Sequence, residues 1–142
     1  MSVLVKLIAV AIFAAGLGIA SVASADVMLI TNTRHAHMTQ ADVRSMFAMR
    51  LRQWPDDGAA VIVFVLGPSD PTHAAFCKRI LDVFPYQLQR AWDRLVYSGT
   101  GQAPFELNSM EEMKWRVATT PGAIGYITTD RMDERVNPLR LQ

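Results

Sequence analysis

Seven residues of types that suit ligand binding stand in loops that follow expected strands or helices. They are Asn32, Thr33, Ser69, Asp70, Thr72, Gly99 and Thr100. Side-chain hydroxyls and backbone N–H groups near a helix N-terminus are typical of anion sites. Ligands of open α/β sheets bind at the carboxyl ends of strands, close to such helices. The sequence therefore predicts that a ligand site, if the chain has one, lies where these loops meet.

A second group of residues has the types that bind metals. His35 and His37 share one polar loop and are followed by Met38. Imidazole suits Cu(II) and a thioether suits Cu(I), so this loop is a weak candidate copper site. A solvated loop with incidental histidines explains the same residues, and we favour it, so neither a metal nor a cofactor is predicted. The single cysteine, Cys77, excludes an intrachain disulfide and is expected to be an inert buried thiol.

No motif in the sequence indicates catalysis. It contains no nucleophile elbow, phosphate-loop lysine, dinucleotide fingerprint or metalloprotease motif. Ser69 and His73 have helical spacing, but no acid is placed to orient the histidine. The formal net charge is only +1, which is too small to hold a phosphate backbone. We therefore expect neither an enzyme nor a nucleic-acid-binding protein.

The first 25 residues have the pattern of a secretory signal peptide. Lys6 precedes the apolar run Leu7–Ala15, and the segment ends in Ala23-Ser24-Ala25. A positive start, a short apolar core and small residues at the exit are typical of cleaved export signals. The alternative is an uncleaved membrane anchor, because the apolar stretch is almost long enough to span a thinned bilayer. We favour cleavage after Ala25, which leaves residues 26–142 as one periplasmic domain.

The elements that must position these residues follow from the hydrophobic pattern. Strands are expected over Val27–Thr31, Ala59–Leu66 and Ala123–Ile127, with an optional edge strand over Val136–Leu141. Helices are expected to begin after capping residues and prolines, which are Thr39, Asp70, Pro85 and Ser109. The alternation predicts an α/β fold with helices packed on a small, mostly parallel sheet. The residues expected in the core are Phe47, Phe64, Phe76, Trp92 and Ile124.

A C-terminal motif carries a family resemblance. The segment Thr120–Tyr126 reads T-P-G-A-I-G-Y, preceded in the chain by the turn Trp54–Gly58 and the loop Tyr97–Gly101. In this order, these segments resemble phosphate-binding periplasmic proteins of the type II solute-binding class, especially their short, stand-alone members. The resemblance implies one lobe of a two-lobed fold, and an ABC transporter or membrane sensor as partner.

The sequence departs from that family where phosphate would bind. Full-length relatives carry the pattern R-x-x-G-S-G-T after the second strand, whereas this chain has Leu66 at the arginine position and Asp70 and Pro71 in the loop. Thr72 is the one match. A missing arginine removes a bidentate donor, and an aspartate repels a dianion. The resemblance therefore implies a single lobe that binds a small solute or anion weakly. The alternative is a ligand-free interaction module that docks on a membrane sensor or transporter.

Overall fold

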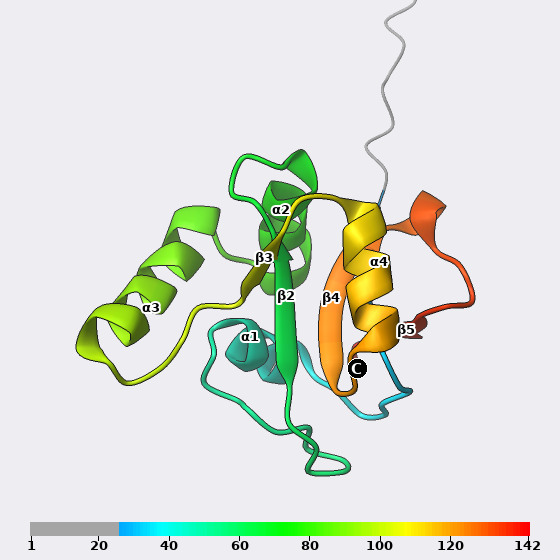
Figure 1. Ribbon diagram of the computed structural model, residues 1–142, viewed down its shortest axis with the longest axis horizontal. Coiled ribbons are helices and arrows are strands. Elements are labelled where there is room, and N and C mark those ends of the chain that lie inside the picture. The colour runs from blue at the N-terminus through cyan, green and yellow to red at the C-terminus, as the bar shows by residue number, and fades with distance from the viewer. Residues whose placement is uncertain (1–25) are drawn as a thin grey trace, which may run out of the picture.

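The computed structural model describes residues 26–142, so the predicted signal peptide lies outside the described residues (Figure 1). In chain order the elements are β1 (Val27–Thr31), α1 (Gln40–Phe47), β2 (Ile62–Leu66), α2 (Pro71–Phe76), the π-helix η1 (Cys77–Leu81), α3 (Pro85–Ser98), β3 (Phe105–Leu107), α4 (Met110–Thr119), β4 (Ala123–Thr128), the 3-10 helix η2 (Thr129–Arg131) and β5 (Asn137–Leu139). Over residues 26–142, no helix has the length and apolar character needed to cross a bilayer.

Five strands form one sheet in the order β3-β2-β4-β1-β5. β2 runs parallel to β3 and β4, whereas β1 runs antiparallel to β4 and β5. The α/β class is therefore confirmed, and the sheet is partly parallel. Because β1 runs against β2, the carboxyl ends of these two strands lie at opposite edges of the sheet.

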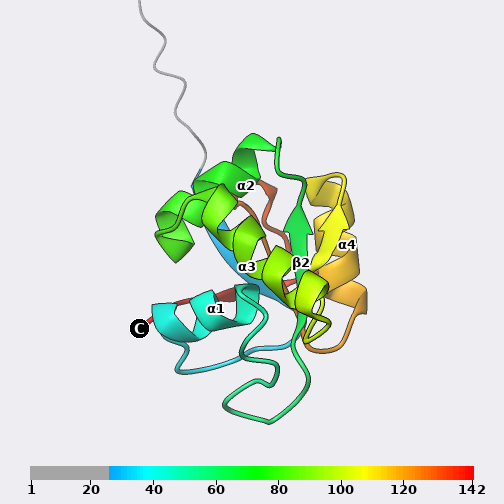
Figure 2. The same cartoon turned by 90° about the vertical axis from the view of Figure 1, so that its left-hand side faces the viewer.

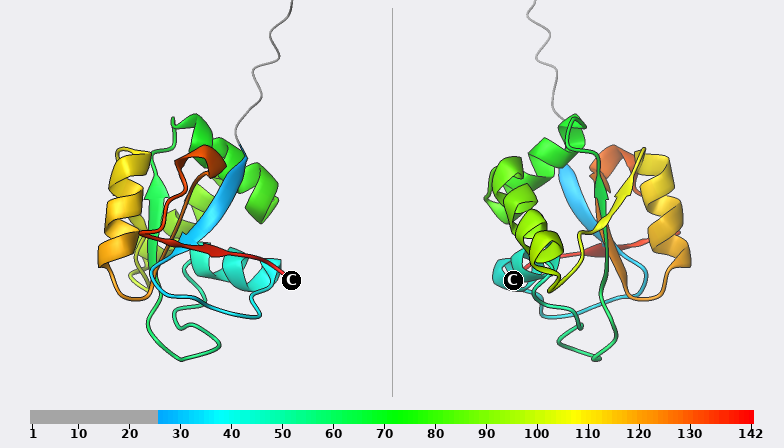
Figure 3. Two further views of the ribbon diagram at one scale, coloured as in Figure 1. Left: turned by 90° about the vertical axis from the view of Figure 1, so that its right-hand side faces the viewer. Right: turned by 60° about the vertical axis from the view of Figure 1, so that its left-hand side comes forward.

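Helices cover both faces of the sheet. α4 lies on one face, and α1, α2 and α3 lie on the other (Figures 1, 2 and 3). The close approach of α4 depends on Gly125 in β4, because a Cβ there would overlap the Met113 side chain. Gly122 has φ 77°, and a Cβ there would overlap the Ala60 carbonyl oxygen. Both glycines of the P-G-A-I-G-Y motif thus have a structural purpose.

The core contains all five of the predicted core residues, which are Phe47, Phe64, Phe76, Trp92 and Ile124. Phe76 stacks on Tyr126 with ring centroids 3.8 Å apart, and Phe47 packs against Phe76 at 4.7 Å. The Trp92 indole N–H donates to the Phe47 carbonyl at 2.7 Å, which fastens α3 to α1. Burying each such aromatic stabilises the fold by several kcal/mol, about 3–5 by truncation to alanine.

The helix starts follow the capping residues of the sequence. Thr39 caps α1 as predicted, and together with Asp42 it forms a capping box. Asp70 caps α2, with Pro71 as its first residue, and Ser109 caps α4 by accepting the Glu112 N–H. These side chains satisfy backbone donors that have no partner inside their helix.

Two features were not evident from the sequence. Phe84 and Val96 are large apolar residues, but they are 61% and 52% exposed. The α2–η1 unit ends at Asp82, which has φ 53°, and Phe84 lies at the start of α3. The short strand β3 was not predicted, whereas β5 falls within the predicted edge strand.

Candidate functional site

The loop after β2 holds three of the predicted ligand residues. Ser69 and Asp70 line a cavity of about 290 Å³, and Thr72 lies in the first turn of α2. One oxygen of the Asp70 carboxylate accepts the Thr72 N–H at 2.8 Å. The Thr72 N–H at the start of α2 is therefore already bonded to Asp70 and is not available to a ligand. Pro71 has no backbone N–H to donate.

The wall of this cavity is acidic. Asp70 faces the same space as Glu106, whose carboxylate lies so close to Gly67 that a Cβ there would be 3.3 Å from Oε1. Two carboxylates without a cation on the wall repel a dianion. Leu66, at the position of the family arginine, is 1% exposed, so its side chain belongs to the core. The geometry agrees with the expectation that phosphate binds poorly at this strand end.

Asn32 and Thr33 lie at the opposite edge of the sheet. The Asn32 side-chain amide donates to the carbonyls of Val117 and Ala118, both at 3.0 Å, at the end of α4. The Thr33 hydroxyl lies 3.1 Å from His35 Nε2. Hydrogen bonding within the fold therefore explains both side chains. Asn32 and Thr33 do not lie near the loop after β2, because β1 and β2 run in opposite directions.

Gly99 and Thr100 line a second, separate cavity of about 570 Å³. Gly99 has φ 69° and ends α3. The Thr100 carbonyl accepts a hydrogen bond from the Arg52 guanidinium at 3.3 Å. This cavity also contacts Val61, just before β2, so it lies at the other end of that strand from Asp70. The predicted ligand residues are thus distributed over three places and do not form one site.

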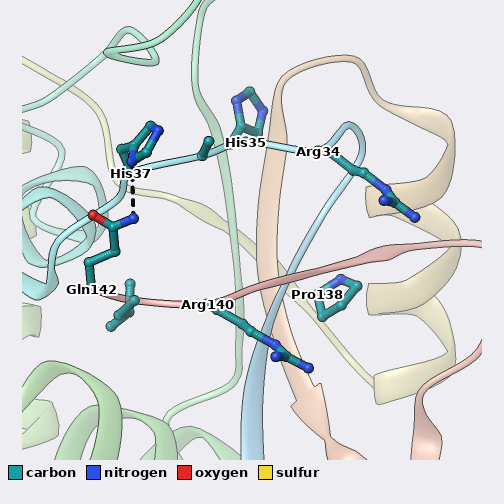
Figure 4. A pocket seen from close by; sticks show the side chains of 8 residues that line it. Arg34, His35, His37, Pro138, Arg140 and Gln142 are labelled. Atoms are coloured by element: carbon teal, nitrogen blue, oxygen red, sulfur yellow. Dashed lines mark hydrogen bonds between the residues drawn. The ribbon is translucent and has the colours of Figure 1, made fainter.

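A third cavity is lined by two arginines, whereas the cavity after β2 has no cation on its wall and the Gly99 cavity has one, Arg52. It has a volume of about 440 Å³ and lies between the loop after β1 and the C-terminal segment that follows β5 (Figure 4). Its lining residues are Arg34, His35, Ala36, His37, Pro138, Arg140, Leu141 and Gln142. We call it the Arg34–Arg140 pocket. It has two guanidinium groups and no carboxylate side chain among its lining residues.

The Arg34–Arg140 pocket has two walls: residues 34–37 form the first and residues 138–142 form the second. Backbone hydrogen bonds hold these two walls together. Met38 and Leu141 form a β-bridge, and the Gln142 N–H donates to the Met38 carbonyl at 3.0 Å. The Gln142 side-chain amide lies 3.0 Å from His37 Nδ1. Arg34 and Arg140 are both exposed and extend toward the same end of the pocket (Figure 4).

The imidazole of His35 anchors the first wall. It stacks on Trp54 with centroids 3.5 Å apart and planes 3° from parallel, and Nδ1 lies 3.0 Å from both carboxylate oxygens of Asp56. Trp54 is fully buried and donates its indole N–H to the Gly122 carbonyl. Partial burial acts to raise the pKa of Asp56, but the hydrogen bond and the charge of His35 outweigh it and lower that pKa.

The two histidines that were weak metal candidates do not act together. His35 bonds to Asp56, whereas His37 bonds to Gln142. Potential ligand atoms of His35, Asp56 and Asp57 do lie within 4.8 Å of one another. However, both ring nitrogens of His35 have a hydrogen-bond partner. Hydrogen bonding alone therefore explains this cluster.

A buried polar chain connects β2, β4 and α2. The Leu66 N–H donates to the Tyr126 hydroxyl at 2.8 Å, and that hydroxyl lies 2.5 Å from His73 Nδ1. The Tyr126 hydroxyl accepts the Leu66 hydrogen bond and can donate its own proton to Nδ1; in that tautomer Nε2–H faces Cys77 Sγ at 3.6 Å. The prediction that Cys77 is buried is confirmed.

Burial controls the ionisation of this chain. It lowers the pKa of His73, although the charges of Asp70 and Glu106 act in the other direction. Burial also raises the pKa of the Cys77 thiol to about 11. Both groups are therefore neutral near pH 7, which is the state in which buried groups cost least.

Comparison with known proteins identifies the fold. No family model matches the sequence, and no curated protein sequence matches it either. Solved structures do match. The ABC-type phosphate transport receptor from Vibrio cholerae superposes with a TM-score of 0.63 at 15% identity, over 82% of this chain and 46% of the receptor. The chain has the fold of phosphate-transport receptors.

A second receptor gives the same result. PstS from Borrelia burgdorferi has a TM-score of 0.62 at 15% identity, over 82% of this chain and 47% of that chain. The present chain therefore spans less than half the length of these phosphate-transport receptors. The fold resemblance stated from the P-G-A-I-G-Y motif is confirmed at the level of the fold.

Arg34 and Arg140 were not predicted as a pair. They are more than one hundred positions apart, and only the pairing of β1 with β5 brings their loops together. The edge strand predicted over residues 136–141 was the one available signal. Had its partner been known to be β1, the polar loop after β1 and the C-terminal arginine would have appeared on one surface.

Proposed function

We propose that this chain is an exported, single-lobe solute-binding module that binds a small anion weakly. The observation that carries the proposal is the Arg34–Arg140 pocket, which faces solvent with two guanidinium groups and no carboxylate side chain on its walls. The fold of phosphate-transport receptors supports a solute-binding role, although fold alone does not determine function. A pocket open to solvent buries only part of a ligand, so we expect weak affinity.

The proposed setting is the periplasm. Residues 1–25 are the proposed signal peptide, and residues 26–142 are the proposed mature domain. The proposed partner is an ABC transporter, because the neighbouring structures are transport receptors by name. The chain is not proposed to be an enzyme.

Calorimetric titration of the purified protein with phosphate, sulfate and acetate at low salt tests the proposal. We expect saturable binding with Kd about 1 mM, which corresponds to about −4 kcal/mol. Arg34→Ala and Arg140→Ala should each weaken binding about 10-fold, because a hydrogen bond to a charged group contributes about 1.5–3 kcal/mol. Arg94→Ala, an exposed arginine of α3, is the matched control and should leave Kd unchanged. Absence of binding to every anion would refute the proposal.

A second function is favoured by a different surface. Phe84, Tyr86, Tyr97 and Phe105 are all more than half exposed, and Tyr97 is 89% exposed. Exposed aromatic residues are enriched in protein interfaces. The alternative proposal is a ligand-free module that docks on a membrane sensor or transporter through these residues. A photo-crosslinker at position 97 should then capture a membrane protein in cells, whereas one at position 134 should not.

A further inference from the structure

The two ends of the Arg34–Arg140 pocket differ in chemistry. Arg34 and Arg140 extend toward one end, beside Pro138, whereas His37 and Gln142 lie at the other (Figure 4). Such a polarity along one cavity is suited to a ligand with two unlike ends. A spherical inorganic ion would use only one of them.

The arginine end is suited to an acidic head group. Within residues 26–142, neither Arg34 nor Arg140 makes a side-chain hydrogen bond or an ion pair. Their guanidinium groups therefore keep all their donors for a ligand. A guanidinium is a planar fork that matches two oxygens of a carboxylate or a phosphate.

The opposite end offers one donor and one acceptor. The Gln142 amide can only donate to His37 through its NH₂ group, so His37 Nδ1 accepts this bond. The imidazole then carries its proton on Nε2, and the Gln142 carbonyl oxygen keeps its acceptor capacity. Together they suit a hydroxyl group, which both donates and accepts. His37 has φ 63°, so a left-handed backbone holds the ring in this place.

Apolar residues also line the pocket. They are Ala36, Pro138 and Leu141, and the volume of about 440 Å³ lies in the range of cavities that hold organic ligands. We infer that the pocket takes a small organic anion with an acidic head at the arginine pair, a short carbon body and a hydroxyl tail. This inference rests on the proposed function and defines its ligand class.

Glycerol 3-phosphate and inorganic phosphate are the probes that test it, with glycerate as the carboxylate counterpart. Titrations of the purified protein should give a Kd about 3- to 10-fold lower for glycerol 3-phosphate than for phosphate, because the tail adds one or two hydrogen bonds. Lower affinity for glycerate than for glycerol 3-phosphate would assign the head group as phosphate, and the reverse as carboxylate. Each result supports the inference, provided that the tail increases affinity.

Variants at the two ends separate the inference from the proposed function. Arg140→Ala should raise the Kd of both inorganic phosphate and glycerol 3-phosphate about 10-fold. His37→Gly, which keeps the left-handed backbone, and Gln142→Ala should weaken only glycerol 3-phosphate, about 3- to 10-fold. Equal affinity for the two compounds, unchanged by His37→Gly, would overturn the inference and leave anion binding intact. Failure of every anion to bind would overturn both.

Discussion

The Tyr126 hydroxyl allows a quantitative test of the buried polar chain. Tyr126→Phe removes this single oxygen and keeps the ring that stacks on Phe76. Leu66 N–H and His73 Nδ1 then both lose a buried partner. Each unsatisfied buried group costs about 1–3 kcal/mol, so the variant should lose about 2–6 kcal/mol of unfolding free energy. This is a large part of the roughly 5–15 kcal/mol that stabilises a domain.

Urea denaturation followed by tryptophan fluorescence at pH 7.5 measures this loss. Tyr97→Phe is the matched control, because Tyr97 is 89% exposed and its hydroxyl has no partner among the described residues. The double variant with His73→Phe should cost less than the sum of the two single variants, since they share one bond. A loss below about 0.5 kcal/mol for Tyr126→Phe would show that the hydroxyl does not satisfy these groups.

Three further predictions concern the same core. Burial lowers the pKa of His73, so the unfolded state binds the proton first, and stability should fall as the pH drops below about 6.5. Urea midpoints at pH 7.5, 6.5 and 5.5 measure this decline, which His73→Phe should reduce. Gly125→Ala should lower the free energy of unfolding by about 1–3 kcal/mol in the same assay, because the new methyl group overpacks Met113. At Gly58 a Cβ meets no atom within 4 Å, so Gly58→Ala measures only the effect of replacing glycine in a left-handed backbone. Cys77, with a pKa of about 11 and no exposed surface, should resist iodoacetamide at pH 8 until urea unfolds the protein, and rapid native labelling would contradict this reading.

Local signals in the sequence were sufficient to predict most of the helices and strands. Thr39, Asp70 and Ser109 marked three helix starts correctly, because capping acts within a few residues. The apolar run ending at Leu66 marked a buried strand for a similar reason, since both of its faces are covered.

The direction of β1 was not encoded locally. A short apolar run such as Val27–Thr31 fits either a parallel or an antiparallel partner, and only pairing with β4 and β5 decides between them. The expected convergence of Asn32 with Ser69 depended on a parallel β1 and therefore does not occur. The Arg34–Arg140 pocket depends on the same long-range pairing, which explains why it was not predicted.

The position of β1 also has a consequence for how the chain folds. β1 precedes the other strands of the described residues, yet both of its neighbours in the sheet lie in residues 123–139, with Val27 paired to Thr128 and Leu29 to Leu139. Contacts between such distant segments slow folding, because the loop between them must close first. The sheet therefore cannot close around β1 until residues 123–139 have been synthesised, and β1 has no partner strand before then.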